Sequence, residues 1–309
     1  MAPPPPTEIY HDTHLTLILS PHPTTPGHAF ATLHTHTQTQ TPTLFSLPKP
    51  TFITILTTLR RISHTLRTHY TVQRCALITT GGAHLSLLPL HGLTPTWQPV
   101  TNPKKTFHDV HYPGYLTSQD APLMPTAQLN EIAHTIRSHA PTPALKHDCT
   151  FHGPADDANI FARIVRGEAQ QWRVWEDDHH VAFLTPFPNT VGFTVLVPRA
   201  HLASDILGLE EGAYARLMGA AYELAGVLKR AFGLERCGMV FEGFEIDYAH
   251  VKLIPVHGAG GDVGVGEVLR EECREIYPGY VSSLPGPPVA DYEGLVRRAG
   301  EVRREVLGG

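Results

Sequence analysis

A β-strand is predicted by the segment Asp247-Tyr248-Ala249-His250-Val251-Lys252-Leu253-Ile254-Pro255-Val256-His257-Gly258. Its apolar and β-branched residues favour an extended backbone, and Pro255 and Gly258 end the run. Because side chains alternate between the two faces of a strand, Tyr248, His250 and Lys252 are expected on one face. These three groups together can bind an anion, and the imidazole can attack one. The alternative is an exposed strand face with a hydrogen-bonded histidine.

The composition narrows the class of protein. The chain has 309 residues, 41% hydrophobic and 17% charged, which is enough for two domains that each bury a core. No apolar run approaches the ~20 residues that span a bilayer. The four cysteines form no CxxC pair, which indicates reduced thiols, and neither half has a basic stripe for nucleic acid. We therefore expect a cytoplasmic or nuclear protein whose partner is a small molecule, with no nucleic acid and no membrane.

An internal repeat runs through the chain, with a nearly constant offset between equivalent positions. Five landmarks recur in the same order in the two halves, which indicates a duplication. The clearest pairs are Ser20–Gly27 with Thr185–Gly192, Arg74-Cys75 with Arg236-Cys237, His84–Gly92 with His250–Gly258, and Tyr112–Tyr115 with Tyr277–Tyr280.

Each repeat predicts an antiparallel meander, one long helix and a terminal helix, so the expected class is α+β. The long helices are predicted around residues 52–70 and 209–232, where apolar residues recur at helical spacings. We predict one domain over residues 1–137, a linker over 138–157 and a second domain over 158–309. Two similar units in one chain are expected to pack as an intrachain pseudo-dimer. The protein is then a monomeric pseudo-dimer or a homodimer.

The second repeat resembles the histidine-triad (HIT) family of nucleotide hydrolases and transferases. The signature strand of that family carries three alternating histidines before an apolar pair. Here the middle position is His250, and Tyr248 and Lys252 stand in place of the outer two; the first repeat keeps only the middle histidine, His84. The residues that carry the resemblance are Ile160–Glu168, Val174–Asp178, Ala182–Thr185, Pro198–His201 and Leu253–Pro255.

The resemblance implies an enzyme that acts on a dinucleoside polyphosphate or a nucleoside phosphoramidate without a cofactor. In this interpretation His250 is the nucleophile that forms a covalent nucleotidyl-histidine, and Lys252 and Tyr248 steady the phosphate. His257 either reaches a phosphate or holds a turn. The other substrate contacts that the resemblance implies are Ile160, Phe161, Ile164, Phe183, Leu184, Thr185 and, in the first repeat, His84.

Departures from the family's pattern leave two alternatives. The loop Phe241–Asp247 is shorter than usual and acidic, and Thr185 replaces an acidic residue that binds ribose in many members. The chain is then either a non-catalytic nucleotide-binding protein with degraded triads or a diverged enzyme that uses the pocket for another substrate. Cys149 and His152 have a spacing seen in metal sites, but tetrahedral zinc needs four convergent ligands, so no metal is expected.

Overall fold

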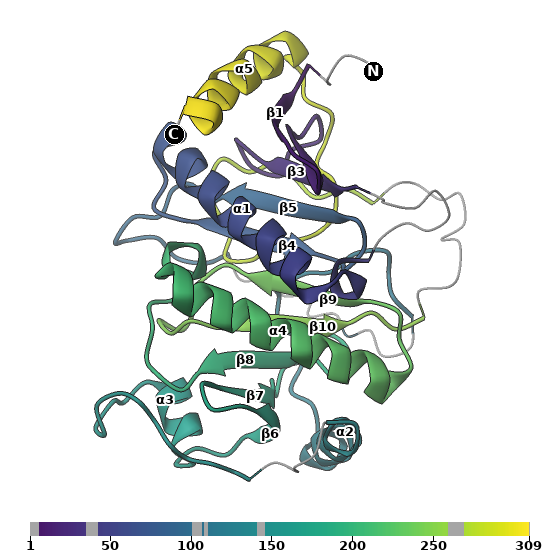
Figure 1. The fold of residues 1–309 in the computed structure, drawn as a ribbon, viewed down its shortest axis with the longest axis vertical. Coiled ribbons are helices and arrows are strands. Elements are labelled where there is room, and N and C mark those ends of the chain that lie inside the picture. The colour runs from purple at the N-terminus through teal and green to yellow at the C-terminus, as the bar shows by residue number, and fades with distance from the viewer. Residues whose placement is uncertain are drawn as a thin grey trace. The chain divides into compact units, whose positions relative to one another are not determined.

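The chain folds into two compact units, and the division between them does not follow the order of the sequence (Figure 1). The computed structural model describes residues 6–34, 43–100, 107, 111–140, 146–258 and 269–308. Unit 1 comprises Met1–Thr101, Tyr115–Thr117 and Val263–Gly309, and unit 2 comprises Asn102–Gly114 and Ser118–Asp262. Within the described ranges, no helix combines the length and the apolar character that a membrane span requires.

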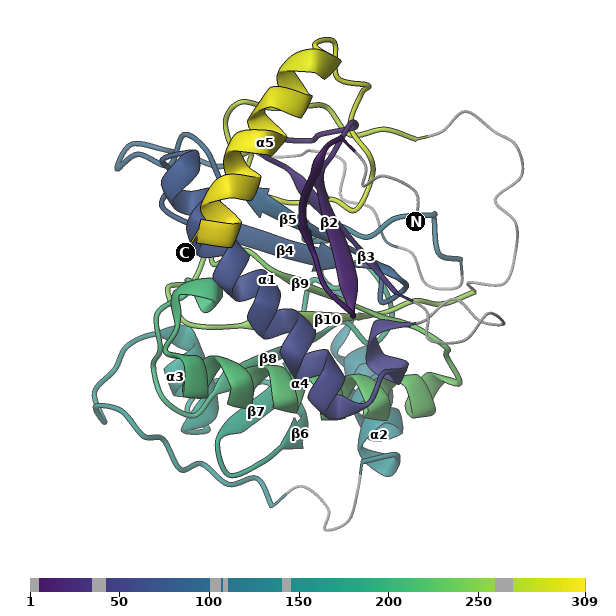
Figure 2. The same ribbon diagram turned by 45° about the horizontal axis from the view of Figure 1, so that its top comes forward.

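Unit 1 contains an antiparallel sheet in the order β1-β2-β3-β5-β4. The long helix α1 lies against β4 and β5 (Figure 2) and buries an apolar stripe from Phe52 to Leu66. Its partner helix at the end of the chain, α5, packs on β1. The elements are β1 (Glu8–His11), β2 (Leu15–Leu19), β3 (Ala29–Leu33), the 3-10 helix η1 (Leu44–Ser46), α1 (Lys49–His69), β4 (Cys75–Thr79), β5 (His84–Pro89) and α5 (Tyr292–Gly308).

Unit 2 repeats this plan, with an antiparallel sheet in the order β9-β10-β8-β7-β6. Glu210 is the N-cap of the long helix α4, where its carboxylate accepts from two backbone N–H groups, and Gly233 ends the helix in the left-handed conformation. The elements are α2 (Thr126–Ser138), α3 (Ile160–Val165), β6 (Trp172–Glu176), β7 (His180–Leu184), β8 (Thr194–Pro198), η2 (Ile206–Gly208), α4 (Glu211–Phe232), β9 (Cys237–Phe241) and β10 (Val251–Pro255). The predicted α+β class is confirmed in both units.

The duplication extends to single backbone positions. Gly27 in unit 1 and Gly192 in unit 2 have φ angles of +78° and +80°. A Cβ atom at Gly27 would collide with the ring of Tyr70, and one at Gly192 with the ring of Phe232. Each glycine therefore serves both a left-handed turn and the close approach of an aromatic ring from the end of the long helix. The same device at equivalent positions of the two repeats supports a common origin of the two sheets.

The segment that follows the first repeat packs in unit 2. Ala121 donates its backbone N–H to the carbonyl of Phe187 at 3.0 Å, and Met124 donates to Pro186 at 2.9 Å. Helix α2, which follows directly, packs against β6. The first repeat thus supplies the segment around Ala121 and Met124, and the helix α2, to the unit that is otherwise built from the second repeat.

The end of the second repeat makes the matching contacts in unit 1. Gly286 donates its backbone N–H to His22 at 2.9 Å, and Val289 donates to Pro21 at 2.9 Å. Helix α5 then packs against β1. Each donor and each acceptor is the repeat equivalent of its counterpart in unit 2, so the terminal segments of the two repeats are exchanged.

This exchange explains why the compact units differ from the predicted domains over 1–137 and 158–309. Those boundaries describe the sequence repeat and place each terminal helix with the repeat that precedes it. The structure assigns α2 to unit 2 and α5 to unit 1 instead. Residues 141–145 of the predicted linker lie outside the described residues. The pseudo-dimer stays a prediction.

Candidate functional site

The predicted strand over 247–258 is shorter in the structure, where β10 covers Val251–Pro255. The residues just before it leave the ladder, because Tyr248 donates its backbone N–H to Ile246 and Ala249 donates to Leu202. His250 therefore lies at the point where the chain enters the sheet. Directly after His250, β10 pairs with β8 from Val251 and with β9 from Lys252.

The tautomer of neutral His250 follows from one hydrogen bond. Its Nδ1 lies 2.7 Å from the carbonyl oxygen of Tyr248. A carbonyl oxygen only accepts hydrogen bonds, so Nδ1 carries the proton and Nε2 carries the lone pair. Nε2 has no hydrogen-bond partner in the described part of the chain, and it is not among the fully enclosed atoms that lack one. The nitrogen that carries the lone pair is therefore unoccupied and reaches solvent, although the residue is only 5% exposed.

Burial keeps this imidazole neutral. It lowers the pKa of His250 to about 4, and the positive charge of Lys252 acts in the same direction. The ring of Phe161 meets the imidazole edge-on, with centroids 5.3 Å apart. At neutral pH the side chain is thus an uncharged imidazole that contacts the backbone on one side and an aromatic ring on the other.

Lys252 forms a buried ion pair that was not predicted. Its Nζ lies 3.1 Å from Glu242 Oε1 and donates to the carbonyl of Ser118 at 3.2 Å. Ser118 Oγ in turn donates to the other oxygen of Glu242 at 3.0 Å. Burial alone would lower the pKa of Lys252, but the carboxylates of Glu242 and Glu245 raise it above its ordinary value. The ammonium is therefore charged at neutral pH and has one N–H left for a ligand.

Tyr248 does not lie where the prediction placed it. Its side chain is fully buried and its hydroxyl donates to the carbonyl of Pro198 at 2.7 Å. Burial makes the largest contribution to the raised pKa of this phenol. The predicted hydrogen bond from the Tyr248 hydroxyl to a phosphate is therefore corrected: the hydroxyl proton is already donated, and the residue acts on His250 through its backbone carbonyl.

His201 fixes the segment that precedes His250, and the sequence did not single it out. Its Nδ1 lies 2.6 Å from the Asp157 carboxylate and its Nε2 donates to the Asp247 carbonyl at 2.6 Å. The ring stacks on Tyr248 at 4.7 Å. Burial lowers its pKa, but these hydrogen bonds outweigh burial and raise the pKa above its ordinary value. Its place after the Pro198 corner was the only signal in the sequence.

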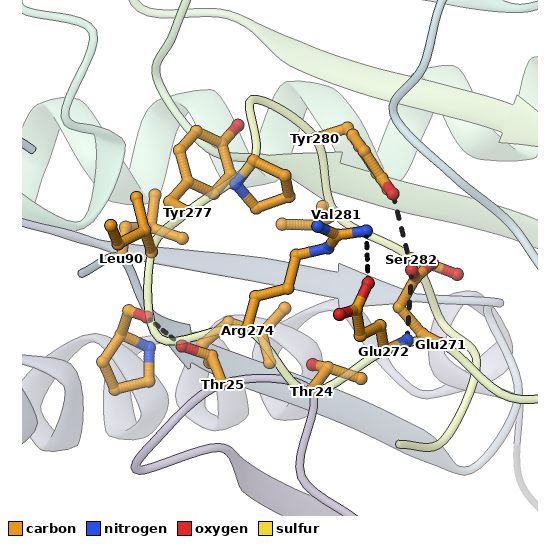
Figure 3. Close-up of a pocket in the computed structure, with 14 residues that line it drawn as sticks. Thr24, Thr25, Leu90, Glu271, Glu272, Arg274, Tyr277, Tyr280, Val281 and Ser282 are labelled. Atoms are coloured by element: carbon orange, nitrogen blue, oxygen red, sulfur yellow. Dashed lines mark hydrogen bonds and ion pairs between the residues drawn. The ribbon is translucent and has the colours of Figure 1, made fainter. Parts of the chain in front are cut away.

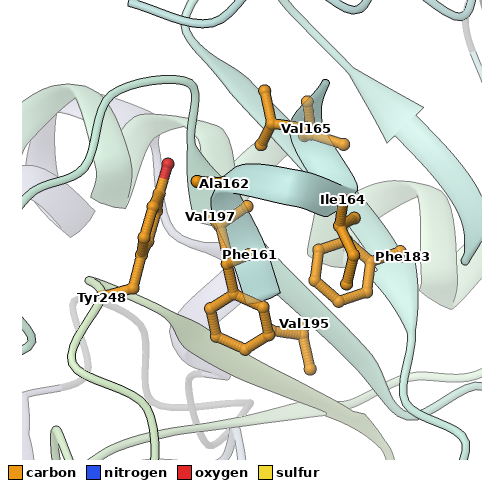
Figure 4. Close-up of a cluster of buried hydrophobic side chains, with 9 residues drawn as sticks. Phe161, Ala162, Ile164, Val165, Phe183, Val195, Val197 and Tyr248 are labelled. Carbon is orange, nitrogen blue, oxygen red and sulfur yellow. The ribbon is translucent and has the colours of Figure 1, made fainter. Parts of the chain in front are cut away.

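The residues predicted to contact a base and a ribose lie in and beside a buried cluster (Figure 4). Phe161, Ile164 and Phe183 pack with Val195, Val197 and the ring of Tyr248, so they are core residues. Of these, Phe161 also borders His250. Leu184 is 2% exposed, whereas Ile160 is 41% exposed and free to meet a ligand.

Two remaining predicted contacts are engaged in local structure. The Thr185 hydroxyl accepts from the backbone N–H of Phe187 at 3.2 Å. His257 donates from Nε2 to the carbonyl of Val191 at 2.9 Å, and its counterpart His91 donates to Pro26 at 2.9 Å. Of the two interpretations of His257, the structure shows the one in which it holds a turn.

The equivalent position in unit 1 lacks the geometry of His250. His84 is exposed, its Nδ1 lies 3.3 Å from the Thr32 hydroxyl, and its ring stacks on Phe30. The place of Lys252 is taken by Ser86, which accepts a hydrogen bond from the buried His28 at 2.9 Å. At the position of Lys252, unit 1 therefore has a hydroxyl in place of an ammonium. Among the described residues of both units, no group of three or more His, Cys, Asp or Glu side chains is arranged to hold a metal.

Comparison with known proteins gives partial matches. No family model matches the chain. A HIT-like protein of Saccharolobus solfataricus is 28% identical over 127 residues, which are 40% of this chain and 91% of that protein. A Bacillus subtilis protein with the name "Protein hit" is 26% identical over 124 residues, which are 38% of this chain and 83% of that protein. A crystal structure of an ADP-glucose phosphorylase from Arabidopsis thaliana with bound ADP-glucose aligns over 96% of this chain and 86% of that chain, with 11% identity and a TM-score of 0.46.

Proposed function

The chain is related to the histidine-triad (HIT) proteins, and from that premise we propose that it transfers or hydrolyses a nucleoside monophosphate group through His250. The substrate is a dinucleoside polyphosphate or a nucleoside phosphoramidate. The observation that carries the proposal is the hydrogen bond from His250 Nδ1 to the Tyr248 carbonyl, because it leaves the lone pair on an unoccupied Nε2.

In the first step, the Nε2 lone pair forms a bond to the α-phosphorus. The bond from phosphorus to the leaving oxygen or nitrogen breaks, and the leaving group departs with that electron pair and takes up a proton from solvent. The remaining N–H of Lys252 donates to a nonbridging phosphate oxygen, while Glu242 and Ser118 hold the ammonium in place.

In the second step, an acceptor attacks the phosphorus of the nucleotidyl-histidine, the phosphorus–nitrogen bond returns its electrons to Nε2, and the proton of the acceptor goes to solvent. If water is the acceptor, the product is a nucleoside monophosphate and the enzyme is a hydrolase. If inorganic phosphate is the acceptor, the product is a nucleoside diphosphate and the enzyme is a transferase. His250 needs no separate base in either case, because the pKa of about 4 keeps it neutral at physiological pH. We assign a bound base to Ile160, which is 41% exposed, and to Phe161, whose ring borders His250.

The test is to trap the covalent intermediate. The protein is mixed with a dinucleoside polyphosphate and, separately, with a nucleoside phosphoramidate, each radiolabelled at the α-phosphate, and is quenched in base. We expect a label on the wild-type protein that acid releases, as a phosphorus–nitrogen bond requires. His250→Ala should carry no label, and His84→Ala is the matched control that should keep it. A label of wild-type size on His250→Ala would refute the proposed nucleophile.

The small exposed fraction of His250 favours one second candidate, a nucleotide-binding protein without turnover. At 5% exposure the imidazole has little room for an attacking geometry unless neighbouring side chains move. That candidate predicts that nucleotide raises the melting temperature, while neither a label nor product forms. The trapping experiment with a parallel melting curve therefore separates the two functions.

A further inference from the structure

His201 in unit 2 faces two hydrogen-bond acceptors at once. Its Nδ1 lies 2.6 Å from Asp157 Oδ2, and its Nε2 lies 2.6 Å from the carbonyl oxygen of Asp247. An ionised carboxylate and a carbonyl oxygen only accept hydrogen bonds, so both ring nitrogens carry a proton. The hydrogen-bond pattern therefore describes His201 as an imidazolium, whereas burial keeps His250 neutral.

The groups around His201 favour this positive charge. Burial lowers the pKa of His201, but the hydrogen bonds to Asp157 and Asp247 and the charges of these two carboxylates raise it above the ordinary value of 6.5. The backbone N–H of Asn159 makes the largest contribution to the lowered pKa of Asp157, which keeps that carboxylate ionised. Arg166 is a further charged group beside Asp157, and its Nη2 donates to the Asp157 carbonyl at 2.7 Å.

The acceptor Asp247 lies three residues before His250 in the same segment. Its carbonyl oxygen also accepts from Asn159 Nδ2, at 3.1 Å. The ring of the next residue, Tyr248, stacks on the His201 imidazole with centroids 4.7 Å apart and an interplanar angle of 19°. The Tyr248 carbonyl then accepts from His250 Nδ1 at 2.7 Å. His201 thus contacts both residues that lead to the backbone group that orients His250.

A neutral His201 cannot keep both of its hydrogen bonds. The Asp157 carboxylate is the stronger acceptor because it is charged, so the one remaining proton stays on Nδ1. Nε2 then directs a lone pair at the Asp247 carbonyl oxygen, and two acceptors repel each other at 2.6 Å. Asp247 keeps its hydrogen bonds to Asn159 and Ser204. The segment therefore stays folded, but it is held less firmly.

We propose that His201 is a positioning residue for the reaction at His250, and that loss of its proton on the alkaline side slows that reaction. The charged form holds Asp247, and with it the imidazole of His250, in the place from which Nε2 attacks. The neutral form loosens the segment, and a poorly placed nucleophile reacts more slowly. The tautomer of His250 is still set by the Tyr248 carbonyl. The inference rests on the proposed function of His250.

The pH profile of the labelling step tests the proposal. In single turnovers, the rate of label transfer should fall at least about fivefold between about pH 6 and 9, with a midpoint above about 6.5. His250 gives the acid limb, near pH 4. Lys252 does not give the alkaline limb: burial lowers its pKa, but the carboxylates of Glu242 and Glu245 raise it above that of an ordinary lysine. A rate that does not fall on the alkaline side would overturn the proposal.

Three variants separate the proton of His201 from the mere presence of the side chain. Asp157→Asn removes the charge and keeps the size, so the midpoint should move to lower pH by about one unit or more. His201→Gln keeps an N–H for Asp247 but cannot titrate, so its rate should vary less than about threefold across the range. His201→Phe keeps a ring on Tyr248 without a donor, and its rate should be at least about fivefold low throughout. An alkaline fall of wild-type size and midpoint in His201→Gln would overturn the proposal.

Two control variants change the same chemical groups elsewhere in the chain. Glu271→Gln matches Asp157→Asn, since it exchanges a carboxylate for an amide in unit 1. Glu271 borders a small cavity there and accepts from the Tyr280 hydroxyl at 3.4 Å (Figure 3). His179→Gln matches His201→Gln, because His179 is exposed. Both controls should keep the alkaline limb of the wild type. A control that shifts the limb as far as its matching variant would contradict the role of His201.

Nuclear magnetic resonance of isotope-labelled histidine tests the positioning role without substrate. The signal of His201, identified by its absence in His201→Gln, should show two N–H protons at about pH 6.5 and a pKa above that value. Exchange of the His250 Nδ1 proton with water should quicken as His201 titrates, because the segment is then held less firmly. A His201 that is neutral at about pH 6.5, or an exchange rate that ignores its titration, overturns the positioning role even if label forms on His250. If no label forms at any pH, the proposed function fails, and these two signals alone decide whether His201 controls the segment.

Discussion

His250 and Tyr248 are joined by a hydrogen bond of 2.7 Å from the imidazole Nδ1 to the backbone carbonyl oxygen. The tautomer of the proposed nucleophile is therefore set by the main chain and not by a carboxylate. A main-chain acceptor has no pKa in the working range, so the tautomer does not depend on pH. It also means that the Tyr248 side chain can change without changing which nitrogen of His250 attacks.

Tyr248→Phe tests this separation of roles. The phenol donates to the Pro198 carbonyl, so its removal leaves a buried acceptor unsatisfied and should cost about 1–3 kcal/mol in the free energy of unfolding. The rate of label transfer to His250 should stay within about threefold of wild type. If the phenol instead donated to the phosphate, the rate would fall about 10²-fold or more. Urea denaturation and single-turnover labelling give the two numbers.

The pH dependence of stability should report two buried neutral histidines. Burial lowers the pKa of both His28 and His250 to about 4, against about 6.5 in the unfolded chain. Below pH 6.5 the unfolded state binds protons that the native state does not bind, so stability is highest above pH 6.5. It falls as the pH drops towards 4, by up to about 1.4 kcal/mol per pH unit for each histidine.

Urea denaturation between about pH 4.5 and 8, in steps of roughly half a pH unit, measures that slope. His28→Gln should reduce the slope of the unfolding free energy against pH by the contribution of one histidine. The exposed His179, replaced in the same way, should leave it unchanged. A His28→Gln protein with the wild-type slope would contradict the assignment of His28 as a buried neutral group.

What could be predicted from the sequence was local or periodic. The position of His250 before an apolar strand, the two long helices and the repeat all depend on residues within a few positions of one another or on a fixed offset. The contact of Lys252 with Ser118 could not be predicted, because the two are 134 residues apart and nothing in either segment refers to the other. Tyr248 was misplaced for a related reason: the strand begins only at Val251, so alternation did not apply before it.

Removing the partner of Lys252 should be costly. Glu242→Gln leaves a buried ammonium without its carboxylate, and we expect a loss of about 3–5 kcal/mol in the free energy of unfolding. The double variant Glu242→Gln/Lys252→Met should recover part of that loss, because no unpaired charge remains. Arg297→Gln is the matched control, since its pair with Asp291 is more than half exposed and should contribute less than about 1 kcal/mol. Equal losses in Glu242→Gln and Arg297→Gln would show that burial of the pair does not matter.

A comparison of Gly192 with Gly233 separates the energetic cost of backbone strain from that of steric collision. Gly192 and Gly233 both have positive φ angles, +80° and +64°, but only at Gly192 would a Cβ meet an aromatic ring. Gly233→Ala should cost about 1–2 kcal/mol from the left-handed backbone alone. Gly192→Ala should cost a further ~1–3 kcal/mol from overpacking against Phe232. Thermal unfolding of the two variants gives the difference, and equal costs would mean that Phe232 moves aside freely.

The exchange of terminal segments predicts that each terminal helix stabilises the sheet of the other repeat, which the order of the sequence alone does not predict. Val302 is fully buried on α5, which packs against β1, and Ile136 is fully buried on α2, which packs against β6. Val302→Asp buries an unpaired charge and should release α5, so amide hydrogen exchange should rise in β1 while β6 stays protected. Ile136→Asp should do the reverse. If each helix served the repeat that precedes it, Val302→Asp would expose β6 instead. The pattern of exchange therefore decides which sheet each terminal helix stabilises, because an unpaired charge weakens only the surface on which its own helix packs.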